Sequence, residues 1–392
     1  MKNKKILALA LALLLTSLVS LPAFAEDGVN AELIVQKTLR TNVGTTIPDS
    51  TFYFQLNHVG FENDPDRMVH IQDLPQDQWV TRGSVSFDST QRPTETSPGI
   101  FEVSGSSENL LENITWPRPG RYSFMLELVP NTNQLNNTPP VTEIMVYNYV
   151  VWGVHVWVRA DAAGDLFVAA VQVFQADDEP YNEETTFGAK VAYAEFISDF
   201  VRKYDNYTSG PGEDERGLRV SKTVDGDSAN PTTDFTFSAI LTSPPIASEF
   251  RPSDQPETFT AIITGASGGD YGELIEFTSG VENTFQLRHG QSLQFNSLPV
   301  GTMFYIEEID FLHYTPSITI IINGEPIPPF GPAGTGTQFL GEGRNYAAFL
   351  NTAESSPITG LFGISPPTLI IGVATIAVLA LIVVSQRKRA NE

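Results

Sequence analysis

Short runs of β-branched and aromatic residues are the feature that most constrains the fold of this 392-residue chain. Residues 51–56 read TFYFQL, residues 167–174 read FVAAVQVF, and residues 317–322 read SITIII. Clusters of Pro, Gly, Asn and Asp separate such runs at short intervals, and helical periodicity is scarce. Runs of this composition favour strands, and many short strands without intervening helices are typical of β-sandwiches. The sequence therefore predicts an all-β protein.

Both ends of the chain have the composition of targeting segments. The first 25 residues combine a lysine-rich start, an apolar run and an A-x-A motif that ends at Ala25, so residues 1–25 are predicted to be a signal peptide. Residues 361–385 are apolar and long enough to cross a bilayer as a transmembrane helix. The basic cluster at 387–389 fits the cytoplasmic side of a membrane. Export and anchoring would leave residues 26–359 outside the cell.

Composition limits the chemistry of this exterior part. The chain has no cysteine, so neither disulfides nor thiolate chemistry are available to it. Its formal net charge of −23 favours solubility and argues against nucleic-acid binding. The five histidines are scattered without the spacing of metal ligands, so neither a metal nor a cofactor is predicted. A length of about 330 residues predicts two or more domains.

The exterior part divides at residues 208–217, TSGPGEDERG, a small and charged stretch without an apolar anchor. We interpret this stretch as a linker between residues 26–207 and residues 218–353. Each part begins with a Lys-Thr strand, LIVQKT in the first and LRVSKT in the second, and continues to a strand of the form F-x-F. This weak internal repeat of long period is expected for two tandem domains.

Three polar residues of the second domain are predicted to lie together. Strand alternation places Lys222 on a face with two valines, and Asn351 on a face with phenylalanine and alanine. Neither side chain belongs on an apolar face unless a partner satisfies it. Glu308 is the third of these residues and shares a face with Ile306, whereas its neighbour Glu307 lies on the opposite face.

The motifs VSKTV at 220–224, GTxxxxxE at 301–308 and AxFxN at 347–351 resemble the major pilins of Gram-positive bacteria, of the streptococcal T-antigen type. The resemblance implies Ig-like β-sandwich domains with a spontaneous Lys–Asn isopeptide bond between their first and last strands. It implies Lys222 as the nucleophile, Asn351 as the electrophile and Glu308 as the acid. Burial would lower the pKa of the lysine and raise that of the glutamate, as this chemistry requires.

The first domain departs from the pattern. Lys37 is well placed, but the candidate acid Glu127 is one residue short and would face the other way without a bulge. The asparagine position of the family falls on Ser198, which cannot form an amide, whereas a one-residue shift would offer Asp199. The sequence therefore leaves two alternatives for this domain: a Lys37–Asp199 isopeptide bond assisted by Glu127, or a domain held by packing alone.

Residues 354–392 resemble a sortase sorting signal, in which an LPxTG-like pentad precedes a transmembrane span and a basic tail. The pentad here is Ser356-Pro357-Ile358-Thr359-Gly360, with serine in place of the usual leucine. The resemblance implies that a sortase cleaves between Thr359 and Gly360 and passes the threonine carbonyl to an amine. The alternative is a plain C-terminal membrane anchor.

Polymerisation would require an exposed lysine that attacks the threonine held by the sortase. Only Lys37, Lys190, Lys203 and Lys222 lie between the signal peptide and the basic tail. In the pilins that the chain resembles, the linking lysine lies a few residues before the end of the last strand of the N-terminal domain. Lys190 matches that place, Lys203 is the second choice, and an ordinary surface lysine is the alternative.

Together these features predict a structural, non-enzymatic subunit of a covalently linked pilus, anchored to the wall of a Gram-positive bacterium. The implied partners are a sortase, neighbouring subunits and peptidoglycan. A host surface ligand is a further candidate partner, and nucleic acid is not expected to bind. A monomeric wall-anchored adhesin or minor pilin is the first alternative, because it needs no linking lysine. A surface enzyme with an unrecognised site is the second.

Overall fold

The computed structural model describes residues 30–58, 80–130, 133, 135–138, 141–176, 187–204, 216–246, 257–311 and 313–353. Within these ranges every regular element is a strand, so the predicted all-β class is confirmed. Across the same ranges, no helix has the length and apolar character needed to cross a membrane. The signal peptide, the sorting pentad and the transmembrane helix predicted from the sequence lie outside the described residues.

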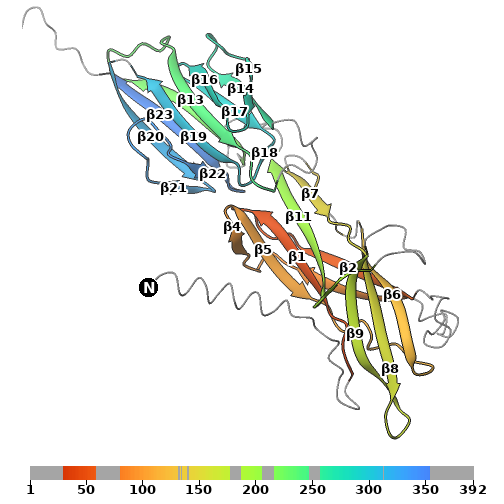
Figure 1. Ribbon diagram of the computed structural model, residues 1–392. Helices are drawn as coiled ribbons and strands as arrows, with labels where there is room; N and C mark the ends of the chain where they lie inside the picture. Colours follow the sequence, from red (N-terminus) through yellow and green to blue (C-terminus); the bar gives the residue numbers. More distant parts are fainter. Residues whose placement is uncertain are drawn as a thin grey trace, which may run out of the picture.

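Residues 30–204 form two facing sheets, which we call the first sandwich (Figure 1). One sheet has the order β11-β1-β5-β4, with β7 also paired to β11, and the other has the order β10-β9-β8-β6-β2-β3. The strands are β1 (Val35–Asn42), β2 (Ser50–His58), β3 (Val80–Phe87), β4 (Thr94–Ser97), β5 (Ile100–Ser106), β6 (Gly120–Val129), β7 (Val141–Tyr147), β8 (Trp152–Ala160), β9 (Leu166–Ala176), β10 (Phe187–Val191) and β11 (Ala194–Tyr204).

Residues 216–353 form the second sandwich, again from two sheets (Figure 1). One has the order β15-β14-β17-β12-β23-β20-β21 and the other the order β16-β13-β19-β22. The strands are β12 (Leu218–Asp225), β13 (Phe235–Thr242), β14 (Thr258–Gly265), β15 (Leu274–Thr278), β16 (Glu282–Leu287), β17 (Gln291–Asn296), β18 (Leu298–Pro299), β19 (Met303–Asp310), β20 (Tyr314–Ile322), β21 (Glu325–Ile327), β22 (Gln338–Phe339) and β23 (Asn345–Ala353).

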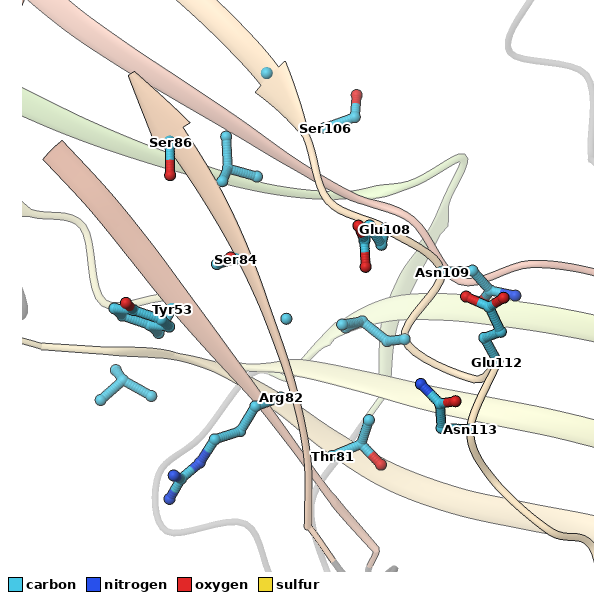
Figure 2. Close-up of a pocket in the computed structure, with 15 residues that line it drawn as sticks. Tyr53, Thr81, Arg82, Ser84, Ser86, Ser106, Glu108, Asn109, Glu112 and Asn113 are labelled. Carbon is cyan, nitrogen blue, oxygen red and sulfur yellow. The ribbon is translucent and has the colours of Figure 1, made fainter. Parts of the chain in front are cut away.

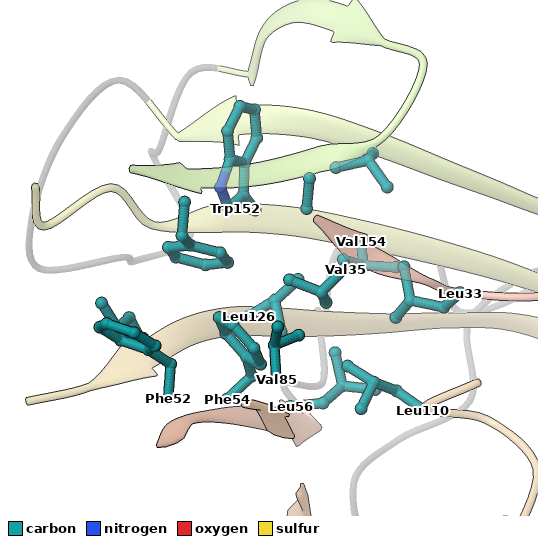
Figure 3. Close-up of a cluster of buried hydrophobic side chains, with 14 of the residues drawn as sticks. Leu33, Val35, Phe52, Phe54, Leu56, Val85, Leu110, Leu126, Trp152 and Val154 are labelled. Carbon is teal, nitrogen blue, oxygen red and sulfur yellow. The ribbon is translucent and has the colours of Figure 1, made fainter. Parts of the chain in front are cut away.

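Each sandwich has a hydrophobic core of its own. Along β2 the residues Phe52, Phe54 and Leu56 are fully buried and point at the facing sheet, while the residues between them are more exposed (Figure 3). This alternation follows from the two-residue period of a strand. Burial of each such side chain contributes about 1.5–3 kcal/mol. In a chain without cysteine, these two cores supply most of the non-covalent stability.

The first and last strands of each sandwich lie side by side and run parallel. In the first sandwich β1 pairs with β11, and Lys37 lies opposite Phe196. In the second sandwich β12 pairs with β23, and Lys222 lies opposite Phe349. The facing sheets also correspond, because β2 pairs with β6 as β13 pairs with β19. The two lysines therefore occupy equivalent positions of equivalent strand pairs.

Strand β11 continues beyond the first sandwich and joins the second. Its last residues Lys203 and Tyr204 pair with Pro299 and Leu298 of β18. Main-chain hydrogen bonds from Val300 to Arg202 and from Ser297 to Tyr204 frame this pairing. The sheet containing β1 thus extends across the junction between the two sandwiches (Figure 1).

Polar side chains reinforce the junction. The Arg202 guanidinium forms ion pairs with Glu143 of the first sandwich, at 2.6 Å, and with Glu342 of the second. The Asn42 side chain donates to the main-chain oxygen of Ile246 at 2.8 Å and accepts from its nitrogen at 3.0 Å. Because these groups are largely buried, they are screened less than surface ion pairs and help to fix the relative position of the sandwiches.

Candidate functional site

Lys222 lies in the core of the second sandwich with no exposed surface. Its position on β12 turns the side chain toward the facing sheet, where its Nζ lies 4.2 Å from the ring centre of Phe235 and 5.9 Å from that of Phe237. Nζ also donates to both carboxylate oxygens of Glu308 at 2.8 Å. A buried amine is thus held between an aromatic wall and a carboxyl group.

Glu308 connects this amine to an amide. It lies on β19 opposite Phe237 and is buried. Its Oε1 accepts a hydrogen bond of 2.5 Å from Nδ2 of Asn351, which reaches the same space from β23. The Asn351 Oδ1 is buried and has no hydrogen-bond partner among the described residues. Amine, carboxyl and amide therefore converge from three strands and both sheets.

The neighbouring glutamate has a different environment. Glu307 accepts a hydrogen bond of 2.6 Å from the hydroxyl of Tyr305 and is only partly buried. Because adjacent residues of a strand point to opposite faces, only Glu308 can enter the core. The structure thus places Lys222, Glu308 and Asn351 together and Glu307 apart from them.

Burial shifts both titratable groups of the site toward their neutral forms. It lowers the pKa of Lys222 to about 8, although the nearby Glu308 acts in the opposite direction. It also raises the pKa of Glu308 above the usual range for a carboxyl group, against the opposing effects of Lys222 and Asn351. A neutral amine beside a protonated acid is therefore accessible near neutral pH, because the low-dielectric core penalises the charged forms.

This arrangement can support an exchange of one amide for another. A neutral Lys222 amine can attack the Asn351 carbonyl carbon, which forms a new C–N bond. The asparagine C–N bond then breaks, and one proton from Nζ goes to the departing nitrogen, so that ammonia leaves. Glu308 contacts both the amine and the amide nitrogen, which suits a group that carries this proton.

In the first sandwich, Lys37 occupies the place of Lys222. It is fully buried, and its Nζ lies 4.4 Å from the ring centre of Phe52. Instead of a carboxylate, Nζ contacts the main-chain oxygens of Thr38, at 2.9 Å, and Phe196, at 3.1 Å. Burial lowers the pKa of Lys37 to about 7.

The residues that would react with Lys37 are replaced. Leu128 lies opposite Phe54 on β2, as Glu308 lies opposite Phe237 on β13. Ser198 follows Phe196 by two residues, as Asn351 follows Phe349. The first sandwich therefore has the lysine of the site but neither its acid nor its amide.

The alternative of a Lys37–Asp199 bond assisted by Glu127 requires a correction. The pairing of β1 with β11 has no register shift, so Asp199 points away from the core, where it forms an ion pair with Arg40 at 2.6 Å. Glu127 also points away from the core and accepts a hydrogen bond of 2.7 Å from Asn57. The structure brings neither group to Lys37, because the expected bulges are absent and strand alternation turns both side chains outward.

The two candidate linking lysines differ in exposure. Lys190 is exposed on β10, which is the edge strand of its sheet. Its predicted place near the end of the last strand is wrong, because that strand is β11 and begins only at Ala194. Lys203 lies within β11, is half-buried and belongs to the pairing with β18 at the junction. An exposed amine on an edge strand is open to an incoming acyl group, whereas one at the junction is hindered. The sorting pentad that would supply the acyl group lies outside the described residues.

A cavity of about 810 Å³ lies beside the edge strand β3, between that strand and the loop that follows β5 (Figure 2). No candidate residue predicted from the sequence lines it. Five lining side chains make no hydrogen bond or ion pair within the described part of the chain, namely Arg82, Ser84, Glu108, Glu112 and Asn113. Tyr53 adds a partly exposed ring to the lining. The cavity therefore offers unengaged polar groups to a ligand.

Sequence reasoning missed one feature of the lysine sites. The aromatic wall beside Lys222 comes from the F-x-F strand, which the sequence identifies only as a repeated strand. Leu128 at the position of the acid agrees with the sequence, in which Glu127 is one residue short. Finding the wall requires knowledge of which strands face each other, which is a property of the fold.

Comparison with known protein families gives a match in the second sandwich. A family model described as a domain of unknown function, DUF7601, matches residues 216–326. No curated protein matches the chain. The family match covers the part of the second sandwich that contains Lys222 and Glu308.

Solved structures similar to the chain include two major pilins and one adhesin. The major pilin of Streptococcus pyogenes is 18% identical, with a TM-score of 0.34, and the match covers 83% of this chain and 99% of that one. The T3.2 major pilin of the same species is 17% identical, with a TM-score of 0.34 and coverage of 84% and 100%. The pilus-presented adhesin Spy0125 (Cpa) is 11% identical, with a TM-score of 0.26 and coverage of 82% and 100%. Values this low assign no function to the chain.

Proposed function

We propose that the chain is a structural subunit of a sortase-assembled, covalently linked surface pilus, and that an isopeptide bond between Lys222 and Asn351 locks its second sandwich. The observation that carries the proposal is the buried contact of the Lys222 amine and the Asn351 amide with one carboxyl group, Glu308. An unlinked charged lysine with no exposed surface would be a costly feature of a core. Conversion to an amide removes that cost.

The site has the groups that the reaction needs. The aromatic wall and the absence of exposed surface exclude water, which keeps the amine a nucleophile and the acid protonated. Glu308 gives its proton to the departing nitrogen and takes one from the attacking amine, so that ammonia leaves and the acid ends the reaction unchanged. Because each sandwich would react once with itself, the triad is not an enzyme active site.

The position of the bond suits a fibre under tension. Lys222 lies on the first strand of the second sandwich and Asn351 on the last, and these strands are neighbours. A bond between them would carry a pulling force directly from one strand to the other and bypass the residues between. In a chain without cysteine, such a bond would take the mechanical place of a disulfide.

The linkage between subunits would join Thr359 of one subunit to Lys190 of the next. Support comes from the exposure of Lys190 on an edge strand and from the pentad followed by an apolar span and a basic tail. The sortase would hold Thr359 as an acyl group, and the Lys190 amine would displace it. The last subunit would pass to peptidoglycan in the same way.

The proposal is tested by the ladder of polymers in a cell-wall digest, boiled in SDS and probed with antibody to the chain. Cells with the natural chain should give a ladder of high-mass bands, and Lys190→Arg should abolish it. Lys203→Arg is the matched control and should leave the ladder intact. A ladder that persists in Lys190→Arg and disappears in Lys203→Arg would move the linkage to Lys203, and a single monomer band throughout would refute polymerisation.

A wall-anchored monomeric adhesin is the second candidate, and the cavity beside β3 favours it. Its unengaged polar side chains and the Tyr53 ring are groups that recognise a hydroxyl-rich ligand such as a glycan. Binding of the chain to immobilised host glycans tests this function. The double substitution Glu112→Ala with Asn113→Ala should then abolish binding and leave any polymer ladder unchanged.

A further inference from the structure

Lys37 is a buried amine that the proposed function does not use. Its side chain has no exposed surface and faces the ring of Phe52. Its only hydrogen bonds within the described residues go to two main-chain oxygens, those of Thr38 and Phe196. A charged amine in such a place lacks a counter-ion in direct contact.

Within the described part of the chain, the surroundings of Lys37 offer it no reactive partner. Leu128 takes the place of the acid, and Ser198 takes the place of the amide. The Ser198 hydroxyl is itself buried without a hydrogen-bond partner among the described residues. Because neither a hydroxyl nor an alkyl group can condense with an amine to form an amide, Lys37 stays a free amine.

The charged groups near Lys37 act on it only from the other face of the sheet. Asp199 and Glu195 favour its protonated form and Arg40 disfavours it, and burial outweighs all three. Asp199 is engaged with Arg40, and Glu195 accepts a hydrogen bond from Thr38. The other ionisable side chains that face the core from packed elements are His58 at the end of β2, Tyr122 on β6 and Tyr147 on β7.

Burial of this amine links the stability of the first sandwich to pH. In the unfolded chain the lysine keeps an ordinary pKa of 10.5, whereas burial lowers the pKa to about 7 in the fold. Between these values the unfolded chain binds one more proton than the folded chain, so falling pH favours unfolding. The penalty is absent above about pH 10.5, grows as the pH falls and is complete below about pH 7.

We propose that the first sandwich is the yielding half of the subunit, because it holds Lys37 as a free buried amine without a cross-link. It unfolds while the second sandwich remains folded, and its stability rises with pH from the neutral to the alkaline range. One consequence rests on the proposed function. In a fibre under tension, the first sandwich unfolds and lengthens before any covalent bond breaks.

Tryptophan fluorescence isolates this half of the chain. All four tryptophans precede residue 208, and the second sandwich has none. Urea unfolding of the full chain, followed by this signal from pH 7 to pH 10, should show an unfolding equilibrium constant that falls by up to about tenfold for each pH unit. In Lys37→Met the contribution of Lys37 to this pH dependence should vanish. The unfolding equilibrium constant of this variant at pH 7 should be smaller than that of the natural chain by up to roughly a thousandfold. Lys190→Met, which removes an exposed lysine from the same sandwich, is the matched control and should keep the pH dependence.

The proposal is overturned if Lys37→Met keeps the full pH dependence of the natural chain, or if the natural chain shows none. Where Lys37→Met fails to fold, NMR titration of the lysine Cε signals in the natural chain provides the test. Only four lysines lie between the signal peptide and the basic tail, so the signals can be resolved. A buried amine that titrates near pH 7 supports the proposal, and titration only near pH 10, or conversion of the Lys37 amine to an amide, refutes it. Neither readout depends on whether the chain polymerises.

Discussion

Replacing Glu308 with glutamine removes the one carboxyl group that contacts both Lys222 and Asn351. The substitution preserves the size of the side chain, and a glutamine can still form hydrogen bonds in the core. It cannot take a proton from the amine or return one to the departing ammonia. We therefore expect Glu308→Gln to fold without the isopeptide bond.

The size of the effect follows from the loop that the bond closes. Lys222 and Asn351 enclose about 130 residues, and a cross-link that closes a loop of this length stabilises a fold by about 5 kcal/mol in the chain-entropy description. In the unlinked variant Lys222 also stays in the core without its carboxylate, which lowers the stability of the second sandwich further. For a domain of this size, a loss of 5 kcal/mol lowers the melting temperature by roughly 15 °C.

Differential scanning calorimetry measures this change as a shift of the transition of the second sandwich. Glu307→Gln is the matched control, because the same substitution one residue earlier changes a side chain outside the core that contacts Tyr305. It should leave both the bond and the transition in place. The reasoning fails if Glu308→Gln melts within a few degrees of the natural chain, or if its digest still contains the Lys222–Asn351 linked peptides.

Three further variants test other parts of the structure. The double variant Leu128→Glu with Ser198→Asn supplies the missing groups beside Lys37 and should add a second loss of ammonia to the mass of the chain. Asn345 is fully buried and makes five hydrogen bonds, so Asn345→Ala should lower the free energy of unfolding of the second sandwich by about 3 kcal/mol in urea, and a loss below about 1 kcal/mol would contradict this. Arg202→Met removes the ion pair with Glu342 across the junction and should broaden the range of interdomain angles in small-angle X-ray scattering, whereas an unchanged profile would assign the rigidity to the strand pairing.

Local sequence patterns were sufficient to predict the all-β class. Alternation along β2, as in Phe52 and Phe54, also predicts which residues enter the core. The placement of Glu308 inside and Glu307 outside follows from the same two-residue period. These features depend on a residue and its neighbours in one strand, so a single sequence contains the information.

The choice between two adjacent residues of β11 depends on distant pairing, and the sequence alone could not make it. The parallel register of β1 with β11 joins residues about 160 positions apart, and it decides that Ser198, and not Asp199, shares a face with Lys37. The sequence leaves a one-residue shift as an alternative at this point, because Asp199 can form an amide with a lysine and Ser198 cannot. The structure shows that Arg40 satisfies Asp199 on the outer face instead. The sequence alone likewise does not predict that β11 continues into a pairing with β18.

The intact mass of the exported chain is the measurement that tests the central claim most directly. The account predicts a mass lower by one ammonia, about 17 Da, than that of the unmodified sequence after removal of the signal peptide. Tandem mass spectrometry of a digest should place the loss in a linked pair of peptides that contain Lys222 and Asn351. An unshifted mass would contradict the isopeptide bond, and a further loss located at Lys37 would contradict the asymmetry between the two sandwiches.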